Sequence, residues 1–217
     1  PSMGWPLAIK PKIFVALPTP SRASALLHEN AITCRSALAR EQGSPLNSSL
    51  SDPPPVLLMP ALTTYKTPIL QDWVDYNGHL RDAFYLLIFS FATDAFMDRI
   101  GLASDDRDAS GHSLFTLEAH LNYLHEVKLG EPVEVRTQII GHDRKRVQLY
   151  HGLYKADGDV ELAASEQMLL HVDLAGGPKS APFSEQSLEA LRQLSEAQHD
   201  QPAPVYVGRV IGLPRKA

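Results

Sequence analysis

The sequence predicts an α+β domain in which an antiparallel sheet wraps around one long central helix. Three observations carry this prediction: a helix-length segment that is apolar on most of its circumference, four strand-like segments after it, and short turns between those strands. A helix that is apolar all round is buried on several sides, and strands joined by tight turns pair antiparallel. A sheet wrapped around the helix satisfies both conditions.

The first regular element is an opening strand, predicted over Thr64–Val74. A turn-rich loop follows at Asp75–His79, because its Asn-Gly pair is typical of turns. The long helix is predicted over Arg81–Ile100, where aromatic and aliphatic residues occupy most positions. A polar loop over Asp105–Gly111 separates this helix from the strands.

Four further strands are predicted, and they form two pairs. Their ranges are Ser113–Val127, Val133–Ile140, Arg146–Tyr154 and Val160–Val172. A Gly-Glu-Pro turn separates the first two, and Asp157-Gly158 separates the last two and is a good hairpin signal. A surface helix is predicted over Ser184–Ala197 with its leucines on one side, and the chain from Gln201 onward is irregular.

The composition divides the chain into three parts. Residues 1–58 are rich in proline and in small polar residues, so we expect a flexible or disordered N-terminal extension that is dispensable. Residues 59–183, beginning at Met59, form the predicted domain, and residues 184–217 form a C-terminal helix and tail.

The overall composition is that of a soluble globular protein, with 44% hydrophobic and 21% charged residues. The net charge of -5 argues against a nucleic-acid partner, and no apolar run is long enough to span a membrane. The single cysteine, Cys34, excludes an internal disulfide and is typical of a cytoplasmic protein. The histidines show no metal-ligand spacing, so we expect no metal site.

Asp75 is the residue best suited to chemistry, because it stands between a strand and a buried helix. Unpaired N–H groups at a helix N-terminus attract negative charge. A carboxylate beside them suits attack on an acyl carbonyl, as a nucleophile or as the base that activates water, while N–H groups hold the oxyanion. The alternative is that Asp75 caps the turn or the helix, and the local pattern alone favours this capping role.

The segment Asp75-Tyr76-Asn77-Gly78-His79 and the aromatic-rich helix after it resemble the opening of the hydroxybenzoyl-CoA thioesterase-like hotdog family. In that family an acidic residue three positions before a glycine is the catalytic carboxylate, and Asp75 stands three before Gly78. The resemblance covers about residues 64–183 and implies a single hotdog domain with acyl-CoA thioesterase activity. It also implies a homodimer or homotetramer, because hotdog active sites form where two sheets meet.

The chain is similar above all to a narrower group, the betainyl-CoA thioesterases of carnitine degradation. Besides the turn, the segments that carry this likeness are Phe84–Leu86, Ala92–Phe96, Thr116–His120 and Glu166–Asp173. It implies hydrolysis of betainyl-CoA to glycine betaine and CoA, with coenzyme A as part of the substrate and no separate cofactor. Many family members have two asparagines after the Gly-His pair, whereas this chain has Arg81-Asp82, which leaves the orientation of Asp75 open.

The predicted site has a catalytic and a substrate-binding set. The catalytic set is Asp75, Gly78, His79 and Asp82, and the substrate-binding set is Trp73, Tyr76, Asn77, Glu118, His120 and Tyr123. Aromatic faces hold trimethylammonium groups by cation–π attraction, and the rings expected to do so are Trp73, Tyr76, Tyr85 and Tyr123. Glu118 supplies a counter-charge or a second acid or base if its strand face wraps the helix. The plainer alternatives are core packing for the aromatic residues, turn formation for Asn77 and His79, and pairing of Glu118 with His120.

Other functions stay open on sequence alone. One is a hotdog module that binds acyl-CoA or regulates without turnover, and another is a thioesterase for a different short or aromatic acyl-CoA. A dehydratase or hydratase is disfavoured, because the helix and its preceding loop carry no fitting His–Asp arrangement.

Overall fold

The computed structural model describes residues 62–156 and 158–212, so the predicted extension over residues 1–58, the domain start at Met59 and the turn residue Asp157 lie outside it. The described strands form one antiparallel sheet in the order β1-β3-β4-β5-β2, with the short β6 paired to β5. Their bounds are β1 Leu62–Pro68, β2 His112–Tyr123, β3 Pro132–His142, β4 Arg146–Lys155, β5 Glu161–Asp173 and β6 Lys179–Ser180.

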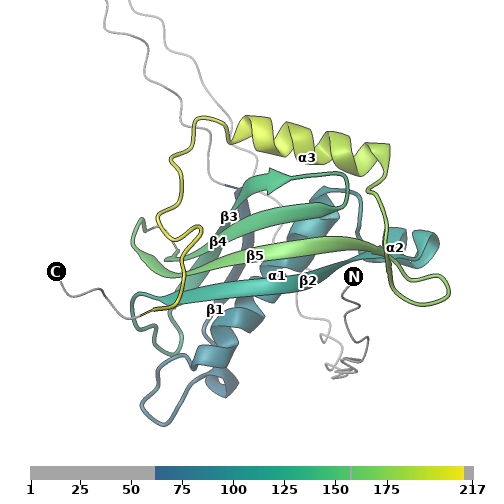
Figure 1. Ribbon diagram of the computed structural model, residues 1–217. Coiled ribbons are helices and arrows are strands. Elements are labelled where there is room, and N and C mark those ends of the chain that lie inside the picture. The colour runs from purple at the N-terminus through teal and green to yellow at the C-terminus, as the bar shows by residue number, and fades with distance from the viewer. Residues whose placement is uncertain (1–61, 157, 213–217) are drawn as a thin grey trace, which may run out of the picture. The chain divides into compact units, whose positions relative to one another are not determined.

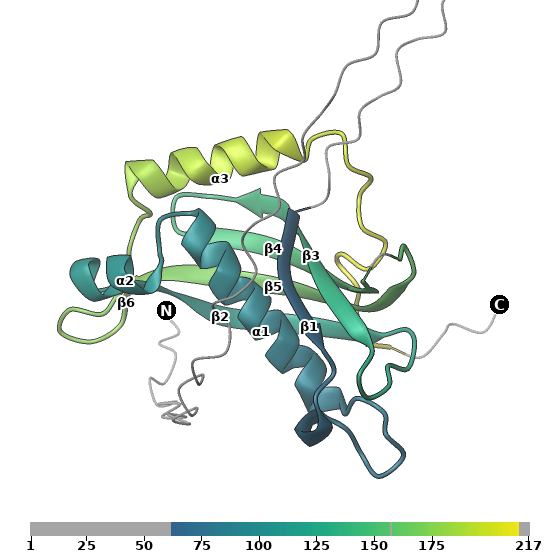
Figure 2. The same ribbon diagram turned by 180° about the vertical axis from the view of Figure 1, so that it is seen from behind.

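The long helix α1, Asp82–Arg99, lies along one face of this sheet (Figure 2). It contacts β1, β2, β3 and β5, which explains why apolar residues surround most of it. Ile88, Phe89 and Phe96 are 0% exposed at its centre. The predicted arrangement of an antiparallel sheet wrapped around a long helix, the hotdog fold, is confirmed.

The predicted surface helix is present as α3, Glu185–Ala197, and it lies across one end of the sheet (Figure 1). The hydroxyl of Ser184 caps it by accepting the N–H of Ser187 at 3.0 Å. Its leucines pack against a core cluster that contains Phe96 of α1 and apolar residues of the sheet. Within the described residues, no helix is long and apolar enough to cross a membrane.

Three sequence predictions differ from the structure. The polar loop expected over 105–111 is a short helix, α2 Ser104–Ser110. Acidic residues in its first turn favour a helix start, and Gly111 ends it in a left-handed conformation, with φ at +70°. The opening strand stops at Pro68, since proline cannot donate to the ladder, and the 3-10 turn η1, Gln71–Trp73, follows. The strand expected to reach Val127 ends at Tyr123.

A buried chain of polar side chains joins the middle of α1 to the sheet. The His151 ring, 0% exposed, contacts the Thr137 hydroxyl at 2.8 Å through Nδ1 and the Thr93 hydroxyl at 3.1 Å through Nε2. Thr93 in turn donates to Gln167 at 3.2 Å. Burial lowers the pKa of His151 to about 3, so the ring is neutral at physiological pH.

Candidate active site

The Asp75–His79 turn is closed by the aspartate itself. Asp75 Oδ1 accepts the backbone N–H groups of Asn77 at 2.8 Å and His79 at 3.0 Å. The Gly78 N–H donates to the Asp75 carbonyl at 3.0 Å, and Gly78 adopts a φ of +78°, which favours glycine. The capping role that the local pattern favoured is therefore present.

Capping leaves the second carboxylate oxygen of Asp75 available. Within the described residues no group donates to Oδ2, and the side chain is partly exposed. The N–H of His79 first, and then that of Asn77, hold the pKa of the Asp75 carboxyl below its usual range, with help from Arg81. The carboxylate is thus ionised at neutral pH, with one oxygen fixed and the other free, so the capping and catalytic roles are compatible.

The turn is tied to the segment that follows β2, residues 124–129, which we call the 124–129 loop. The Leu80 N–H donates to the Val127 carbonyl at 2.8 Å, and the Leu129 N–H donates to the Gly78 carbonyl at 3.0 Å. His79 Nε2 lies 3.4 Å from a carboxylate oxygen of Glu126. These contacts hold the turn and the start of α1 against the 124–129 loop.

A pocket of about 290 Å³, the helix-start pocket, opens beside the first turn of α1 and the 124–129 loop. Its lining consists of Leu80, Asp82, Tyr85, Tyr123, Leu124, His125 and Glu126. The rings of Tyr85 and Tyr123 meet edge to face, with centroids 5.2 Å apart. The Tyr123 hydroxyl donates to the Asp82 carbonyl at 3.3 Å, which joins β2 to the helix start.

The chemistry of this pocket suits a cationic group. Asp82 and Glu126 bring two carboxylates, and the lining contains neither lysine nor arginine. Burial raises the pKa of Tyr85 to about 12, so its hydroxyl stays protonated and donates to the His125 carbonyl at 3.4 Å. Aromatic rings beside negative charge attract ammonium groups by cation–π and Coulomb forces.

The other predicted aromatic residues lie outside this pocket. Trp73 is 8% exposed and stacks on Phe84 with ring centroids 6.2 Å apart. Trp73 therefore packs in the core, as the plainer alternative expected. Tyr76 is 94% exposed in the turn. Within one chain, Tyr85 and Tyr123 are therefore the members of the predicted aromatic set that line the pocket.

Glu118 and His120 lie on the sheet face turned away from α1. The register of β2 slips between Thr116 and Glu118, so Glu118 stands opposite Met168 and His120 opposite Glu166. Neither side chain forms an ion pair within the described residues. The extra residue at this slip reverses the alternation of side chains along β2, so Glu118 does not face α1. Within one chain, Glu118 therefore cannot supply a counter-charge beside the helix.

Sequence reasoning named Tyr85 among the aromatic residues for a trimethylammonium group, but it missed Glu126 as a site residue. It placed Glu126 inside a strand, whereas β2 ends at Tyr123 and Glu126 lies in the 124–129 loop. Within the described part of the chain, no group of three His, Cys, Asp or Glu residues could hold a metal ion.

Comparison with protein families decides the assignment. The family model of the thioesterase-like superfamily matches residues 69–191, which include the Asp75 turn, α1 and four of the five long strands. The chain belongs to the thioesterase-like superfamily. Members of this superfamily hydrolyse thioesters, so the predicted thioesterase family is confirmed.

Two similar proteins also carry thioesterase names. The chain is 65% identical over 153 residues to the betainyl-CoA thioesterase of Pseudomonas aeruginosa, covering 70% of this chain and 96% of that protein. It is 41% identical to the L-carnitine dehydrogenase/betainyl-CoA thioesterase of Agrobacterium fabrum, over 63% of this chain and 27% of that longer protein.

Two solved structures share the fold. A crystal structure of a protein from Pseudomonas putida is 61% identical, with a TM-score of 0.64 over 72% of this chain and 99% of that one. A Staphylococcus aureus protein solved in complex with CoA is 28% identical, with a TM-score of 0.66 over 71% of this chain and 97% of that one.

Proposed function

We propose that this chain hydrolyses betainyl-CoA to glycine betaine and coenzyme A. The observation that carries the proposal is the 65% identity to the Pseudomonas aeruginosa betainyl-CoA thioesterase across 96% of that protein. The helix-start pocket supports it independently, because its two carboxylates and two tyrosine rings suit the trimethylammonium end of this acyl group. Coenzyme A is part of the substrate, and the reaction needs no separate cofactor.

In the proposed mechanism, Asp75 acts through its free Oδ2. Either Oδ2 attacks the acyl carbon and water then hydrolyses the acyl-enzyme, or Oδ2 takes a proton from a water that attacks directly. Both routes break the C–S bond, form a C–O bond and release coenzyme A as its thiol. The N-terminal end of α1 stabilises the oxyanion, and Asp82, which accepts the Ala83 N–H at 2.8 Å, orients that first turn.

Selectivity for the cationic ester is the first prediction. With a panel of betainyl-, acetyl-, benzoyl- and long-chain CoA esters, we expect the highest kcat/KM for betainyl-CoA. Glu126→Gln should lower that value about tenfold and leave acetyl-CoA hydrolysis unchanged, because it removes one charge facing the ammonium group.

Two outcomes would contradict the assignment itself, and a third would contradict only the role of Glu126. A preference for acetyl or benzoyl esters would make the substrate wrong. Tight acyl-CoA binding without release of coenzyme A would support the non-catalytic alternative. A selectivity loss caused by Glu118→Gln instead of Glu126→Gln would show that Glu118 supplies the counter-charge.

We also propose a homodimer in which β2 pairs with β2 of a second copy. This strand lies at the edge of the sheet and is 12 residues long, and an unpaired edge strand is a template for pairing. Phe115, Leu117 and Tyr123 on it are 41%, 57% and 54% exposed. Because Tyr123 also lines the helix-start pocket, a second copy on this edge would complete that pocket.

If the dimer forms through β2, a substitution that breaks it should lower both the mass of the particle in solution and the activity. Leu117→Lys should turn the dimer into a monomer in light scattering and lower kcat/KM, because a charge enters the apolar edge. Val160→Lys, at a position that is 58% exposed outside β2, is the matched control and should change neither. A Leu117→Lys protein that stays dimeric would place the interface elsewhere, and a tetramer would require a second contact surface besides β2.

We place the protein in the cytoplasm, with no nucleic-acid or membrane partner. The single cysteine and the acyl-CoA substrate support this location, because reduced cysteines are typical of that compartment. The net charge of -5 supports the absence of a nucleic-acid partner.

A further inference from the structure

A second cavity, of about 400 Å³, lies on the sheet face turned away from α1. We call it the outer-face cavity. Tyr150 and Tyr154 of β4 line it and alternate with His151 and Leu153, which pack on the α1 side. Residues 201–205 of the C-terminal segment form another wall. Figure 1 shows that segment passing on the opposite side of the sheet from α1.

This C-terminal segment is anchored on both sides of the cavity. Before it, the Gln198 side chain accepts the Ile139 N–H and donates to the Thr137 carbonyl, both at 2.8 Å. After it, the Gly208 N–H donates to the Glu166 carboxylate at 2.6 Å. The wall made by residues 201–205 is therefore held in place by hydrogen bonds to the sheet.

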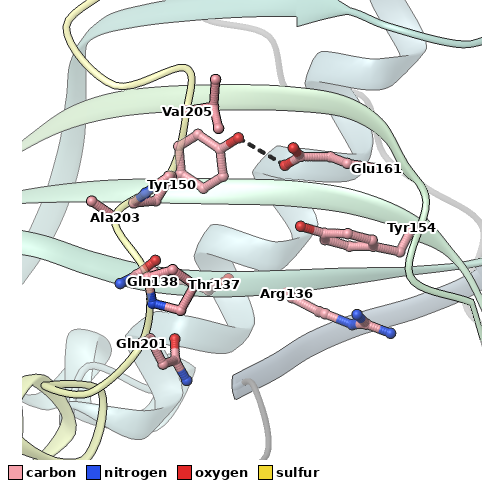
Figure 3. A pocket seen from close by; sticks show the side chains of 11 residues that line it. Arg136, Thr137, Gln138, Tyr150, Tyr154, Glu161, Gln201, Ala203 and Val205 are labelled. Atoms are coloured by element: carbon pink, nitrogen blue, oxygen red, sulfur yellow. Dashed lines mark hydrogen bonds between the residues drawn. The ribbon is translucent and has the colours of Figure 1, made fainter.

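Glu161 brings a half-buried carboxylate into the cavity. Its Oε1 accepts the Tyr150 hydroxyl at 2.7 Å (Figure 3). Within the described residues, Glu161 forms no ion pair. Arg136 also lines the cavity, but its charge is already matched by Glu134 at 2.8 Å and Asp159 at 3.3 Å. Glu134 also pairs with Lys66. Among Glu134, Asp159 and Glu161, Glu161 is therefore the carboxylate without a cationic partner in the described part of the chain.

Gly152 allows Tyr154 and Glu161 to converge over β4. A Cβ at Gly152 would lie 2.6 Å from both Glu161 Oε1 and Tyr154 Cε2, so a larger residue would push them apart. Figure 3 shows the Tyr154 ring between Arg136 and Glu161, and the Arg136 guanidinium lies 4.3 Å from the ring centroid. This ring already interacts with one cation, and its surroundings carry an unbalanced negative charge.

We propose that the outer-face cavity binds a small organic ammonium cation, with its charge opposite Glu161 and its alkyl groups against Tyr150, Tyr154 and the proline-containing wall. Aromatic rings, one carboxylate and an apolar wall together recognise alkylated ammonium groups. A single carboxylate is too few ligands for a metal ion, and it repels anions. The proposal stands on this cavity alone and does not depend on the thioesterase substrate.

The test is calorimetric titration of the full chain with choline at about pH 8, an alkaline pH chosen because burial raises the pKa of Glu161. We expect saturable binding with a dissociation constant on the order of 1 mM, in line with a ligand of few atoms. The neutral isostere 3,3-dimethylbutanol should bind at least about tenfold more weakly, because it lacks the charge. Glycine betaine should also bind more weakly than choline, because its carboxylate meets Glu161.

Variants assign the binding to this cavity. Glu161→Gln keeps an acceptor for Tyr150 and should weaken choline binding about tenfold. Tyr154→Leu should weaken it as well, whereas Tyr154→Phe, which keeps the ring, should not. This Tyr154 pair decides the question even if the Glu161 variant does not fold.

The helix-start pocket also suits a cation, so Glu126→Gln separates the two sites. Choline binding that survives in Glu126→Gln and is weakened in Glu161→Gln supports the proposal. It is overturned if the unchanged chain shows no saturable binding, or if binding is lost in Glu126→Gln and unchanged in both Glu161→Gln and Tyr154→Leu.

Discussion

Asp75→Asn should lower kcat/KM for the preferred acyl-CoA by about 10²- to 10⁴-fold, the range that removing a general base or nucleophile costs. The amide oxygen can still accept the N–H groups of Asn77 and His79, which Oδ1 accepts at 2.8 Å and 3.0 Å in the native turn. The free Oδ2, however, becomes an NH₂ group that is neither a base nor a nucleophile. The turn should therefore survive while the chemistry is lost.

The capping and catalytic roles of Asp75 separate in a comparison of two variants. Asp75→Ala removes both and should also lower the free energy of unfolding, because the N–H groups of Asn77 and His79 lose their acceptor, whereas Asp75→Asn should not. Asp72→Asn, which changes an exposed carboxylate three residues earlier, is the matched control and should stay within about twofold of the native kcat/KM. Full activity in Asp75→Asn would exclude Asp75 from the mechanism.

Local pattern was enough to place the Asp75 turn and the buried helix. The Asn-Gly pair indicates a turn. Apolar residues occur on nearly all sides of the predicted helix over Arg81–Ile100, which indicates that the helix is buried on several sides. Both features depend on short stretches of chain. The predicted helix differs from α1, Asp82–Arg99, by only one residue at each end.

The lining of the helix-start pocket could not be predicted in the same way. It depends on where β2 ends and on the slip in its register between Thr116 and Glu118, which tertiary pairing with β5 determines. One extra residue there turns Glu118 to the outer face of the sheet and turns Tyr123 toward α1. An alternating pattern by itself does not show such a slip.

The lining of the outer-face cavity was even harder to predict from the sequence. The chain from Gln201 onward has no regular pattern, yet its hydrogen bond from Gly208 to Glu166 places it against the sheet. The cavity joins β4 and β5 to a segment about 40 residues further along the chain. Only the folded structure brings these residues together.

Acid should destabilise the domain through His151. Its pKa is about 3 in the folded state, against 6.5 for a free histidine, so below about pH 6.5 the unfolded chain binds a proton that the folded chain does not. The contribution of the neutral ring to stability is complete above pH 6.5 and is lost as the pH falls toward 3. The difference between the two pKa values corresponds to about 5 kcal/mol at most.

Urea unfolding between about pH 7.5 and about pH 4 measures this effect. His151→Gln removes the titrating ring but keeps a group that can reach the Thr93 hydroxyl, which the ring contacts at 3.1 Å. The variant should be less stable than the native chain near neutral pH, yet it should lose several kcal/mol less on acidification, so the two curves converge. His199→Gln, at an exposed position after α3, should follow the native curve. Parallel curves for the native and His151→Gln chains would mean that buried carboxylates, and not this ring, set the acid sensitivity of the fold.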